Sequence, residues 1–463
     1  MAKYSFKKEI NIEDGYDVVV AGGGMAGAAA AICAARLGAK TLLVEATGCL
    51  GGMGTSGLVC AFDPMSDGER MIVGGLMREI VETLYEKGFL EPGFQPDDWE
   101  KTYSHWTPFN PEGLKLVLDE KAVDAGVEIR FFTKVIEADA AGEQGRINGV
   151  IINNIEGYSY IKAKTFIDAT GDAVLSDLCG AAYRAAGRDT EKIMAATLAS
   201  LFANIDWGND KRLLSHRFPN VVDWIEQEYA QGNFSQCDRH LAGMYKIGHS
   251  IGYLNATHIF NMDSTKIKEL SEGMIKGRKL VREYEEFFKK YSPNCRNIEL
   301  VATGSLMGLR ESRRVMGEYD LVFDDYINCR QFPDQIGVLN KFVDIHPYDC
   351  SKAEYERFMR ESKEARMGKG ECFGLPYGII VPKNWKNLWV AGRCSSSDIR
   401  VNGAIRVMPP AAMMGQAAGT AAVQSIRTGQ PACDLDTEEL VKTLRDNGAY
   451  LPQKNLCKNM TRS

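Results

Sequence analysis

The chain has 463 residues, of which 45% are hydrophobic and 25% charged, which is ordinary for a globular protein and long enough for two or three domains. A net charge of -6 without a long basic run argues against a nucleic-acid-binding protein, and the first residues lack the apolar core of a signal peptide, so we expect a cytoplasmic protein. The 12 cysteines include no C-x-x-C pair, so we expect reduced thiols and no metal site.

Residues 16–45 predict a strand, a glycine turn, a helix and a second strand. An apolar run at 18–21 is followed by three glycines in G-x-G-x-x-G spacing, Gly22, Gly24 and Gly27. The first permits the turn, the second lets backbone approach a pyrophosphate, and the third lets the helix pack closely on the sheet. Glu45 follows the second strand, where a carboxylate binds ribose hydroxyls. The stretch predicts a dinucleotide site; the alternative is a glycine-rich turn in an ordinary βαβ unit.

Residues 18–35 are uncharged and mostly apolar, which is also a property of membrane-spanning helices. A span needs about 20 apolar residues. This stretch is rich in glycine and alanine, and Asp17 and Arg36 bound it tightly. We therefore expect a buried strand and helix, and no contact with a membrane.

The remaining elements are predicted in chain order from glycine content and hydrophobic periodicity. Residues 48–57 are too rich in glycine for a helix and predict either a loop against a ligand or a flexible surface loop. The first part of the chain then predicts helices at 69–90 and 111–125 and strands at 127–132, 133–138, 147–153, 158–163 and 166–172. From about 195 onward, we expect helices at 221–231, 264–291, 409–426 and 437–445 and strands at 198–205, 251–260, 298–304, 335–345 and 388–392.

These motifs resemble the FAD-dependent oxidoreductases of the glutathione-reductase-like superfamily, and most closely a bacterial group of mostly undefined substrate. The resemblance rests on 20–27 with Glu45, 50–58, 168–173, 308–314, and 388–393 with 406–409 and 415–419. Together with the element pattern it implies an α/β fold: a Rossmann-like FAD-binding domain with an inserted β-meander, plus an α+β substrate or cap domain. We expect the FAD-binding domain at 1–195 and 370–440, the cap at 196–369, and a tail at 441–463.

The resemblance also implies how FAD is bound. Residues 22–27 would hold the pyrophosphate, Glu45 the ribose, Val135 the adenine through its backbone, and Gly392 would approach the ribitol. A helix starting near Gly415 would aim its N-terminus at flavin O2, where its dipole stabilises the reduced flavin. The implied cofactor-binding residues are Gly22, Gly24, Met25, Ala26, Gly27, Glu45, Ala46, Gly51, Gly52, Met53, Thr55, Ser56, Val135, Ala169, Thr170, Gly171, Asp172, Gly392, Arg393, Gly415, Gln416 and Ala417.

Candidate catalytic residues are Arg310, Arg313 and His258. Arg310, Arg313 and Arg314 are spaced so that they share one helical face, which predicts a clamp for an anionic or hydroxyl-rich substrate. The alternative is a structural ion-pair cluster with Asp320, Asp324 or Asp325. His258 is the first candidate for an acid or base and His105 the second, with a satisfied core or surface histidine as the alternative.

We therefore expect an enzyme, an FAD-dependent oxidoreductase that transfers a hydride between a small polar or anionic substrate and non-covalent FAD. No second G-x-G-x-x-G stands between a predicted strand and a predicted helix, since the one at Gly52, Gly54 and Gly57 lies within the glycine loop, so no separate NAD(P)H domain is expected. Two other classes stay open: a thiazole-synthase-like enzyme on a similar nucleotide fold, and an FAD-containing RNA-modifying protein. The electron acceptor and the oligomeric state stay open as well.

Overall fold

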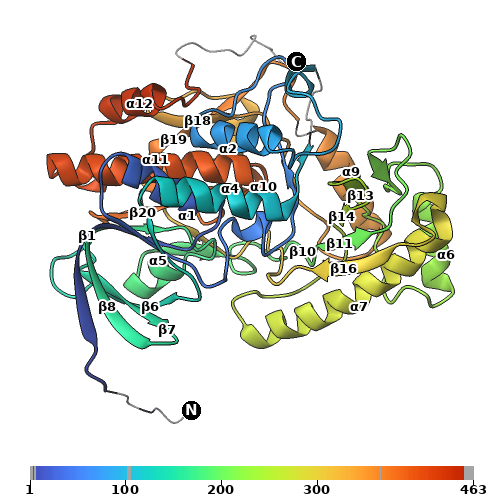
Figure 1. Ribbon diagram of the computed structural model, residues 1–463, viewed down its shortest axis with the longest axis horizontal. Coiled ribbons are helices and arrows are strands. Elements are labelled where there is room, and N and C mark those ends of the chain that lie inside the picture. The colour runs from blue at the N-terminus through green and yellow to red at the C-terminus, as the bar shows by residue number, and fades with distance from the viewer. Residues whose placement is uncertain (1–3, 5–6, 102–105, 365, 453–463) are drawn as a thin grey trace.

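The chain is a mixed α/β protein whose two largest sheets lie at opposite sides of the molecule (Figure 1). The computed structural model describes residues 4, 7–101, 106–364 and 366–452. His105 lies outside these residues.

The larger sheet contains the strands on either side of the glycine turn. β1 pairs in parallel with β2 and with β8, and β20 joins β8 in parallel from far along the chain. β6, β7 and β8 form an antiparallel meander. Across the sheet the strands are β5 (Glu128–Arg130), β2 (Thr41–Val44), β1 (Asn11–Ala21), β8 (Gly157–Asp168), β7 (Gly149–Asn154) and β6 (Lys134–Asp139), with β20 (Leu388–Val390) beside β8.

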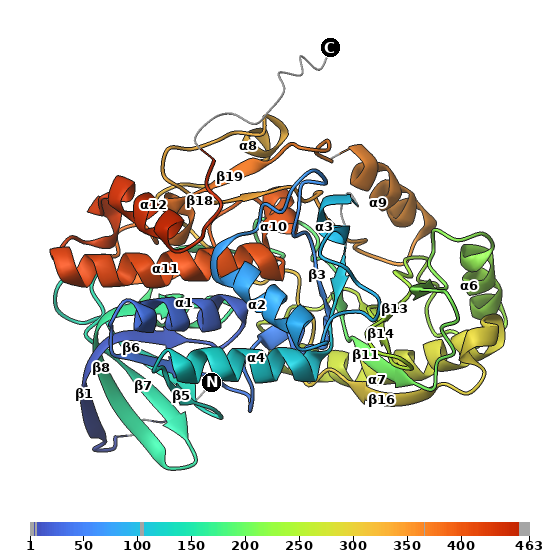
Figure 2. The ribbon, with the colours of Figure 1, turned by 45° about the horizontal axis from the view of Figure 1, so that its top comes forward.

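Helices α1 and α11 pack tightly against one another beside this sheet (Figure 2). A Cβ added at Gly415 would overlap the carbonyl of Ala26, and one at Gly419 would overlap that of Ala30. The two glycines are four residues apart and share one face of α11, so they form the surface on which α1 fits. The helices of this region are α1 (Met25–Arg36), α2 (Gly75–Glu86), α4 (Pro111–Asp124), α5 (Val174–Cys179), α11 (Met408–Thr428) and α12 (Thr437–Asp446).

The second sheet is antiparallel and has its own hydrophobic core. Phe202 and Leu254 from the sheet pack with Ile225 of α6 and Phe288 of α7. These elements are β12 (Arg212–Leu213), β13 (Met244–Lys246), β14 (Gly252–Leu254), β11 (Ser200–Ala203) and β16 (Glu299–Thr303), with α6 (Val221–Ala230) and α7 (Ile267–Tyr291).

Four two-stranded sheets and several short helices complete the described chain. The paired strands are β10 (Ala196–Thr197) with β15 (His258–Ile259), β17 (Arg313–Val315) with β9 (Tyr183–Ala185), β18 (Gln335–Leu339) with β19 (Phe373–Pro376), and β3 (Ala61–Phe62) with β4 (Thr107–Pro108). The remaining helices are α3 (Asp98–Lys101), α8 (Phe323–Ile327), α9 (Lys352–Glu364) and α10 (Ile399–Ile405), with short turns η1 (Gly52–Gly54), η2 (Pro293–Cys295), η3 (Tyr377–Ile380) and η4 (Ala432–Asp434).

Several predicted elements differ from the structure, and the strand expected at 251–260 is divided into β14 and β15. The strands expected at 158–163 and 166–172 are one continuous strand, β8. The helix expected at 69–90 begins only at Gly75, because the Asp67 carboxylate accepts the backbone N–H groups of Glu69 and Arg70 and holds this segment as a turn.

The segment 18–35 forms the buried end of β1 and most of α1, as expected. Among the residues that the structure describes, no helix combines the length and apolar composition needed to cross a membrane.

Candidate functional site

The three glycines between β1 and α1 differ in what surrounds them. Gly22 has φ +93°, and a Cβ at Gly27 would overlap the Gly22 carbonyl, so both are required by the backbone itself. A Cβ at Gly24 would meet no atom within 4 Å. Gly24 precedes α1 without a side-chain cap, so no capping side chain accepts the first N–H groups of the helix. This is the clearance and the set of donors that a pyrophosphate needs.

Glu45 and the glycine loop lie directly beside this turn. The buried Glu45 carboxylate accepts the N–H of Gly23 at 2.6 Å and the N–H of Thr47 at 2.7 Å. A carboxylate has about four acceptor positions, which leaves two for ribose hydroxyls. The Gly51 N–H donates to the Gly23 carbonyl at 2.9 Å, so the loop is held against the turn.

A third segment of expected FAD-binding residues closes one side of the site. Arg393 follows Gly392 and donates hydrogen bonds to the Gly171 carbonyl at 3.0 Å and to Asp172 Oδ1 at 2.6 Å. It also donates to the Leu309 carbonyl at 3.1 Å, which joins the chain near Arg310 to the larger sheet. The structure therefore brings these sequence-distant residues together.

Val135 and Ala46 are two further residues expected to bind the cofactor. Val135 is buried in β6, two residues after Thr133, whose N–H donates to the Glu45 carbonyl at 2.9 Å. Ala46 is exposed beside Glu45. Neither position conflicts with contact to the adenosine half of a dinucleotide.

The helix predicted at 409–426 is confirmed as α11, but the implied helix N-terminus near Gly415 is wrong. α11 begins at Met408, because Pro409 and Pro410 fit its first turn. Gly415 lies inside the helix against α1, and the Gln416 side chain accepts the N–H of Leu76 at 3.0 Å. Gly415, Gln416 and Ala417 thus have packing roles in the described chain, and Met408 stands at the helix end facing the site.

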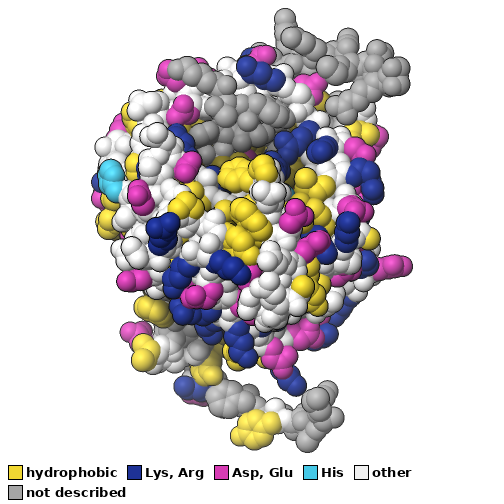
Figure 3. Space-filling model, turned by 90° about the vertical axis from the view of Figure 1, so that its right-hand side faces the viewer, with side chains coloured by type: hydrophobic (Ala, Val, Ile, Leu, Met, Phe, Trp, Pro, Cys, Tyr) yellow, Lys and Arg dark blue, Asp and Glu magenta, His cyan; other side chains and the backbone are white. Residues whose placement is uncertain are grey.

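A cavity of about 430 Å³ lies where the glycine loop meets the second sheet. Met53 and Met408 line it from the loop and the start of α11. Its described lining includes eight lysines and arginines but three carboxylates: Lys211, Arg212, Arg217, Arg310, Lys341, Arg366, Arg393 and Arg406, with Asp63, Glu91 and Asp344. By contrast, Lys, Arg, Asp and Glu are interspersed on the outer surface in Figure 3.

The three carboxylates neutralise only part of this charge. Lys341 pairs with Asp63 at 2.6 Å, and Glu91 and Asp344 pair with Lys211 and Arg406, each at 3.3 Å. Four other guanidinium groups line the cavity, those of Arg212, Arg217, Arg310 and Arg366. Within the described chain, none of the four has a carboxylate within 4 Å. The cavity is therefore electropositive and suits an anion.

Of the arginines expected to form a substrate clamp, Arg310 faces this cavity. It is buried and donates to the Ala195 carbonyl at 2.5 Å and to Thr197 Oγ1 at 2.7 Å. Burial, together with the charge of Arg406, lowers the pKa of Arg310 to about 9, which leaves it charged at neutral pH.

Arg313 and Arg314 do not join Arg310 in a clamp. Residues 313–315 form strand β17 rather than a helix, so neighbouring side chains point in opposite directions. Arg313 pairs with Asp177 at 2.9 Å and lies over the Tyr183 ring. Arg314 pairs with Asp189 and lies 3.7 Å from Glu311. Both arginines are paired with acids of the chain, although these are not Asp320, Asp324 or Asp325.

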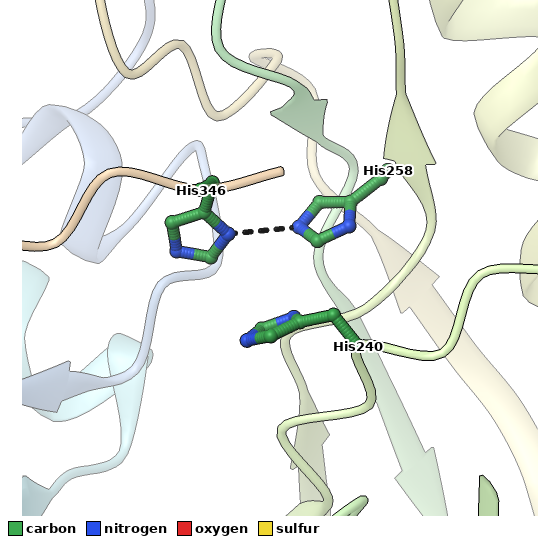
Figure 4. Close-up of side chains that lie close together, drawn as sticks. All are labelled: His240, His258 and His346. Carbon is green, nitrogen blue, oxygen red and sulfur yellow. Dashed lines mark hydrogen bonds between the residues drawn. The ribbon is translucent and has the colours of Figure 1, made fainter. Parts of the chain in front are cut away.

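His258 belongs to a buried histidine cluster at the edge of the cavity. Its Nε2 lies 3.0 Å from Nδ1 of His346, and the rings of His346 and His240 stand around it (Figure 4). His240 and His346 line the cavity, whereas His258 stands behind them. The sequence favoured His258, with His105 second, and not His240 or His346, because positions 240, 258 and 346 show no short-range spacing.

Two aspartates contact the outer sides of this cluster. Oδ2 of Asp238 lies 2.9 Å from Nδ1 of His258, although the angle is not that of an aligned hydrogen bond. Oδ2 of Asp344 lies 3.3 Å from Nε2 of His346. Burial alone would raise the pKa of Asp344, but His346 and the nearby cations hold it well below its usual value. Neither aspartate carried a sequence signal.

The comparisons with known proteins point to one family. A family model described as FAD dependent oxidoreductase matches residues 17–444. No curated protein is significantly similar to the chain.

The solved structures that match the chain are distant in sequence. A geranylgeranyl bacteriochlorophyll reductase-like protein from Thermoplasma acidophilum is 13% identical, with a TM-score of 0.48 over 94% of this chain and 84% of that one. The p-nitrophenol 4-monooxygenase from Pseudomonas putida is 11% identical, with a TM-score of 0.45 over 94% and 81%. A flavin-dependent brominase is 13% identical, with a TM-score of 0.45 over 94% and 83%.

Proposed function

We propose, from the premise that the chain belongs to the family of FAD-dependent oxidoreductases, that it transfers a hydride between a small anionic substrate and non-covalent FAD. FAD is the cofactor of this family, and it supplies the two-electron chemistry when bound. The single observation that carries the substrate class is the electropositive cavity beside the glycine loop.

The residues around the glycine turn fit the cofactor. The open space at Gly24 and the free start of α1 would hold the pyrophosphate, and the unused acceptor positions of Glu45 would hold the ribose. Met53 and Met408 would then border the reactive end of the cofactor. The division into an FAD-binding domain at 1–195 and 370–440 and a cap at 196–369 stays a prediction.

The cavity supports a small, negatively charged substrate. Its volume of about 430 Å³ falls within the roughly 300–1,000 Å³ of small-molecule sites. Because Arg310 has carbonyl and hydroxyl partners but no paired carboxylate within the described chain, its guanidinium retains charge to bind and orient a substrate carboxylate. Orientation by such a group is how an enzyme brings a reacting carbon near its acceptor.

His258 is not placed to touch this substrate. It contacts the cavity through His346, with which it shares a hydrogen bond, and through the ring of His240. An acid or base acting directly on the substrate would therefore have to be a residue of the cavity wall. We therefore propose that the histidine cluster, and not His258 alone, provides the acid or base.

Anaerobic bleaching of the bound flavin tests the substrate class. The protein is mixed without oxygen with size-matched hydroxy acids, dicarboxylates, amino acids and neutral sugars, and flavin absorbance is followed. We expect bleaching by a carboxylate and competitive inhibition by an unreactive carboxylate of similar size. Bleaching by neutral sugars alone, unaffected by added carboxylates, would reject the anionic substrate.

A further inference from the structure

We propose that His240, His258 and His346 bind one divalent transition-metal ion, such as Zn²⁺ or Fe²⁺, at the edge of the cavity. The three come from separate parts of the chain: a loop before β13, strand β15, and the segment after β18. Their ligating nitrogens lie within 4.8 Å of one another, and all three side chains are buried. Imidazole is a preferred ligand of these ions. The inference stands on this geometry and not on the identity of the substrate.

Two rings of the cluster can bind one metal ion if their protons lie on the outer nitrogens. Nδ1 of His258 lies 2.9 Å from the Asp238 carboxylate, and Nε2 of His346 lies 3.3 Å from the Asp344 carboxylate. A neutral ring whose proton lies on this outer nitrogen has a lone pair on its other nitrogen, free to bind a metal ion. The two inner nitrogens, His258 Nε2 and His346 Nδ1, lie 3.0 Å apart, where a metal ion can take the place of the proton of their hydrogen bond.

The separation of these two nitrogens fits a metal ion bound between them. Two nitrogens on one ion, each at about 2.0–2.1 Å, lie about 2.9–3.4 Å apart for bond angles between octahedral and tetrahedral. The observed 3.0 Å between His258 Nε2 and His346 Nδ1 is within that range.

His240 would supply a third nitrogen ligand. A metal ion can bind three nitrogens, whereas a proton shared between His258 and His346 involves only two. Its Nδ1 is buried and has no hydrogen-bond partner among the described residues, so its lone pair or proton is uncompensated. To complete the site, the His240 nitrogen has to approach by roughly 1.5 Å, given the 4.8 Å spread and the spacing expected of metal ligands.

The two aspartates complete a typical metal environment. A carboxylate that accepts the outer N–H of a ligating histidine fixes the ring and raises its basicity. Asp238 and Asp344 would do this for His258 and His346, and their two charges would balance the ion. Because His240 and His346 line the cavity, an open coordination position would face the substrate. The site would therefore accept an oxygen ligand from an anionic substrate.

Metal titration of the FAD-loaded protein tests the site without any turnover. The protein is purified with a chelator, dialysed, and titrated with Zn²⁺ by isothermal calorimetry, and bound metal is counted by elemental analysis. We expect one ion per chain in the wild type. His258→Ala and His346→Ala should each weaken binding by at least 100-fold, and Asp238→Asn by 10- to 100-fold.

Matched variants exclude other sources of binding. His216→Ala removes a buried histidine whose ring lies beside His240, and His249→Ala removes one outside the cluster; both should keep the ion. His346→Gln serves as a second variant if alanine prevents folding, judged by circular dichroism and FAD content. A wild type that binds no Zn²⁺ overturns the proposal, and so does binding that persists unchanged in the cluster variants. Neither result affects the flavin-bleaching test, so the two proposals fail separately.

Discussion

Nε2 of His258 lies 3.0 Å from Nδ1 of His346, although the two residues are 88 positions apart in the chain. β15 carries His258 into the wall behind the cavity, and the segment after β18 brings His346 to meet it from the cavity side. The contact joins the segment that contains the second sheet to the segment that returns toward the larger sheet. It places a buried polar cluster next to the electropositive cavity, so both proposals concern one region of the molecule.

Glu45→Gln should weaken FAD binding by roughly 10- to 150-fold, which corresponds to about 1.5–3 kcal/mol for a lost charge-assisted hydrogen bond. The two oxygens of Glu45 accept the N–H groups of Gly23 and Thr47, and glutamine puts a donating NH₂ group in place of one of them. FAD release on dilution, followed by fluorescence, measures the effect. Glu137→Gln, on the exposed side of β6, is the control. Equal flavin retention in Glu45→Gln and wild type would remove Glu45 from the cofactor site.

Gly24→Val should give a folded but colourless protein. A side chain at Gly24 meets no protein atom, so the fold tolerates it, but it fills the space assigned to the pyrophosphate. Gly27→Val is the contrasting variant: its side chain would overlap the Gly22 carbonyl, so it should lose folded structure as well as colour. Circular dichroism and flavin absorbance together separate the two outcomes. A yellow Gly24→Val protein would contradict the placement of FAD.

Arg310→Ala should slow flavin reduction by substrate while FAD content stays near that of wild type. Loss of a clamp that acts equally in ground and transition states raises KM, and loss of one that strengthens in the transition state lowers kcat. Arg310→Lys keeps the charge but not the fork of donors, so it should recover only part of the rate. Stopped-flow reduction measures both. A normal rate with a lowered Tm in Arg310→Ala would make Arg310 a structural residue.

Arg313→Ala should show the opposite pattern to Arg310→Ala. Its guanidinium pairs with the partly exposed Asp177 and is absent from the cavity lining, so we expect normal reduction kinetics. The loss of a partly exposed ion pair costs about 0.5–1 kcal/mol, so Tm should fall slightly. Thermal melts and the stopped-flow assay are run on the same samples. A reduction rate that falls with unchanged Tm would return Arg313 to the substrate site.

Glu79→Gln should destabilise the protein at neutral pH but not in acid. Glu79 of α2 accepts from Arg36 of α1 and from Lys121 of α4, each at 2.7 Å. Arg36, followed by Lys121, lowers the pKa of Glu79 to about 2. A lowered acid pKa stabilises the folded state above the unfolded pKa of about 4.5, and this is lost as pH falls toward about 2.

The Glu79 effect is limited by solvent, since its side chain is 41% exposed. We expect a loss of at most about 1 kcal/mol at pH 7. Denaturant unfolding at several pH values between neutral and about 3 measures it. Glu82→Gln, whose ion pair with Arg78 stays within α2, is the control. A difference between Glu79→Gln and wild type that does not shrink in acid would contradict the linkage.

The sequence alone determined the elements around the glycine turn. Gly22, Gly24, Gly27 and Glu45 act through local backbone geometry: a positive φ, a missing Cβ, and an acid at a strand end. Such features need no distant partner to be recognised, so β1, α1 and β2 were predicted correctly. Family membership followed from the same local motifs, and the family model bears it out.

Only the tertiary structure decided which side chains meet. Arg310 and Arg313 are three residues apart, yet one faces the cavity and the other Asp177, because the chain there is extended rather than helical. Likewise, the contacts of His258 with Asp238 and His346 depend on how three separate segments pack. Side-chain direction and long-range packing are set by the whole fold, and no short stretch of sequence contains them.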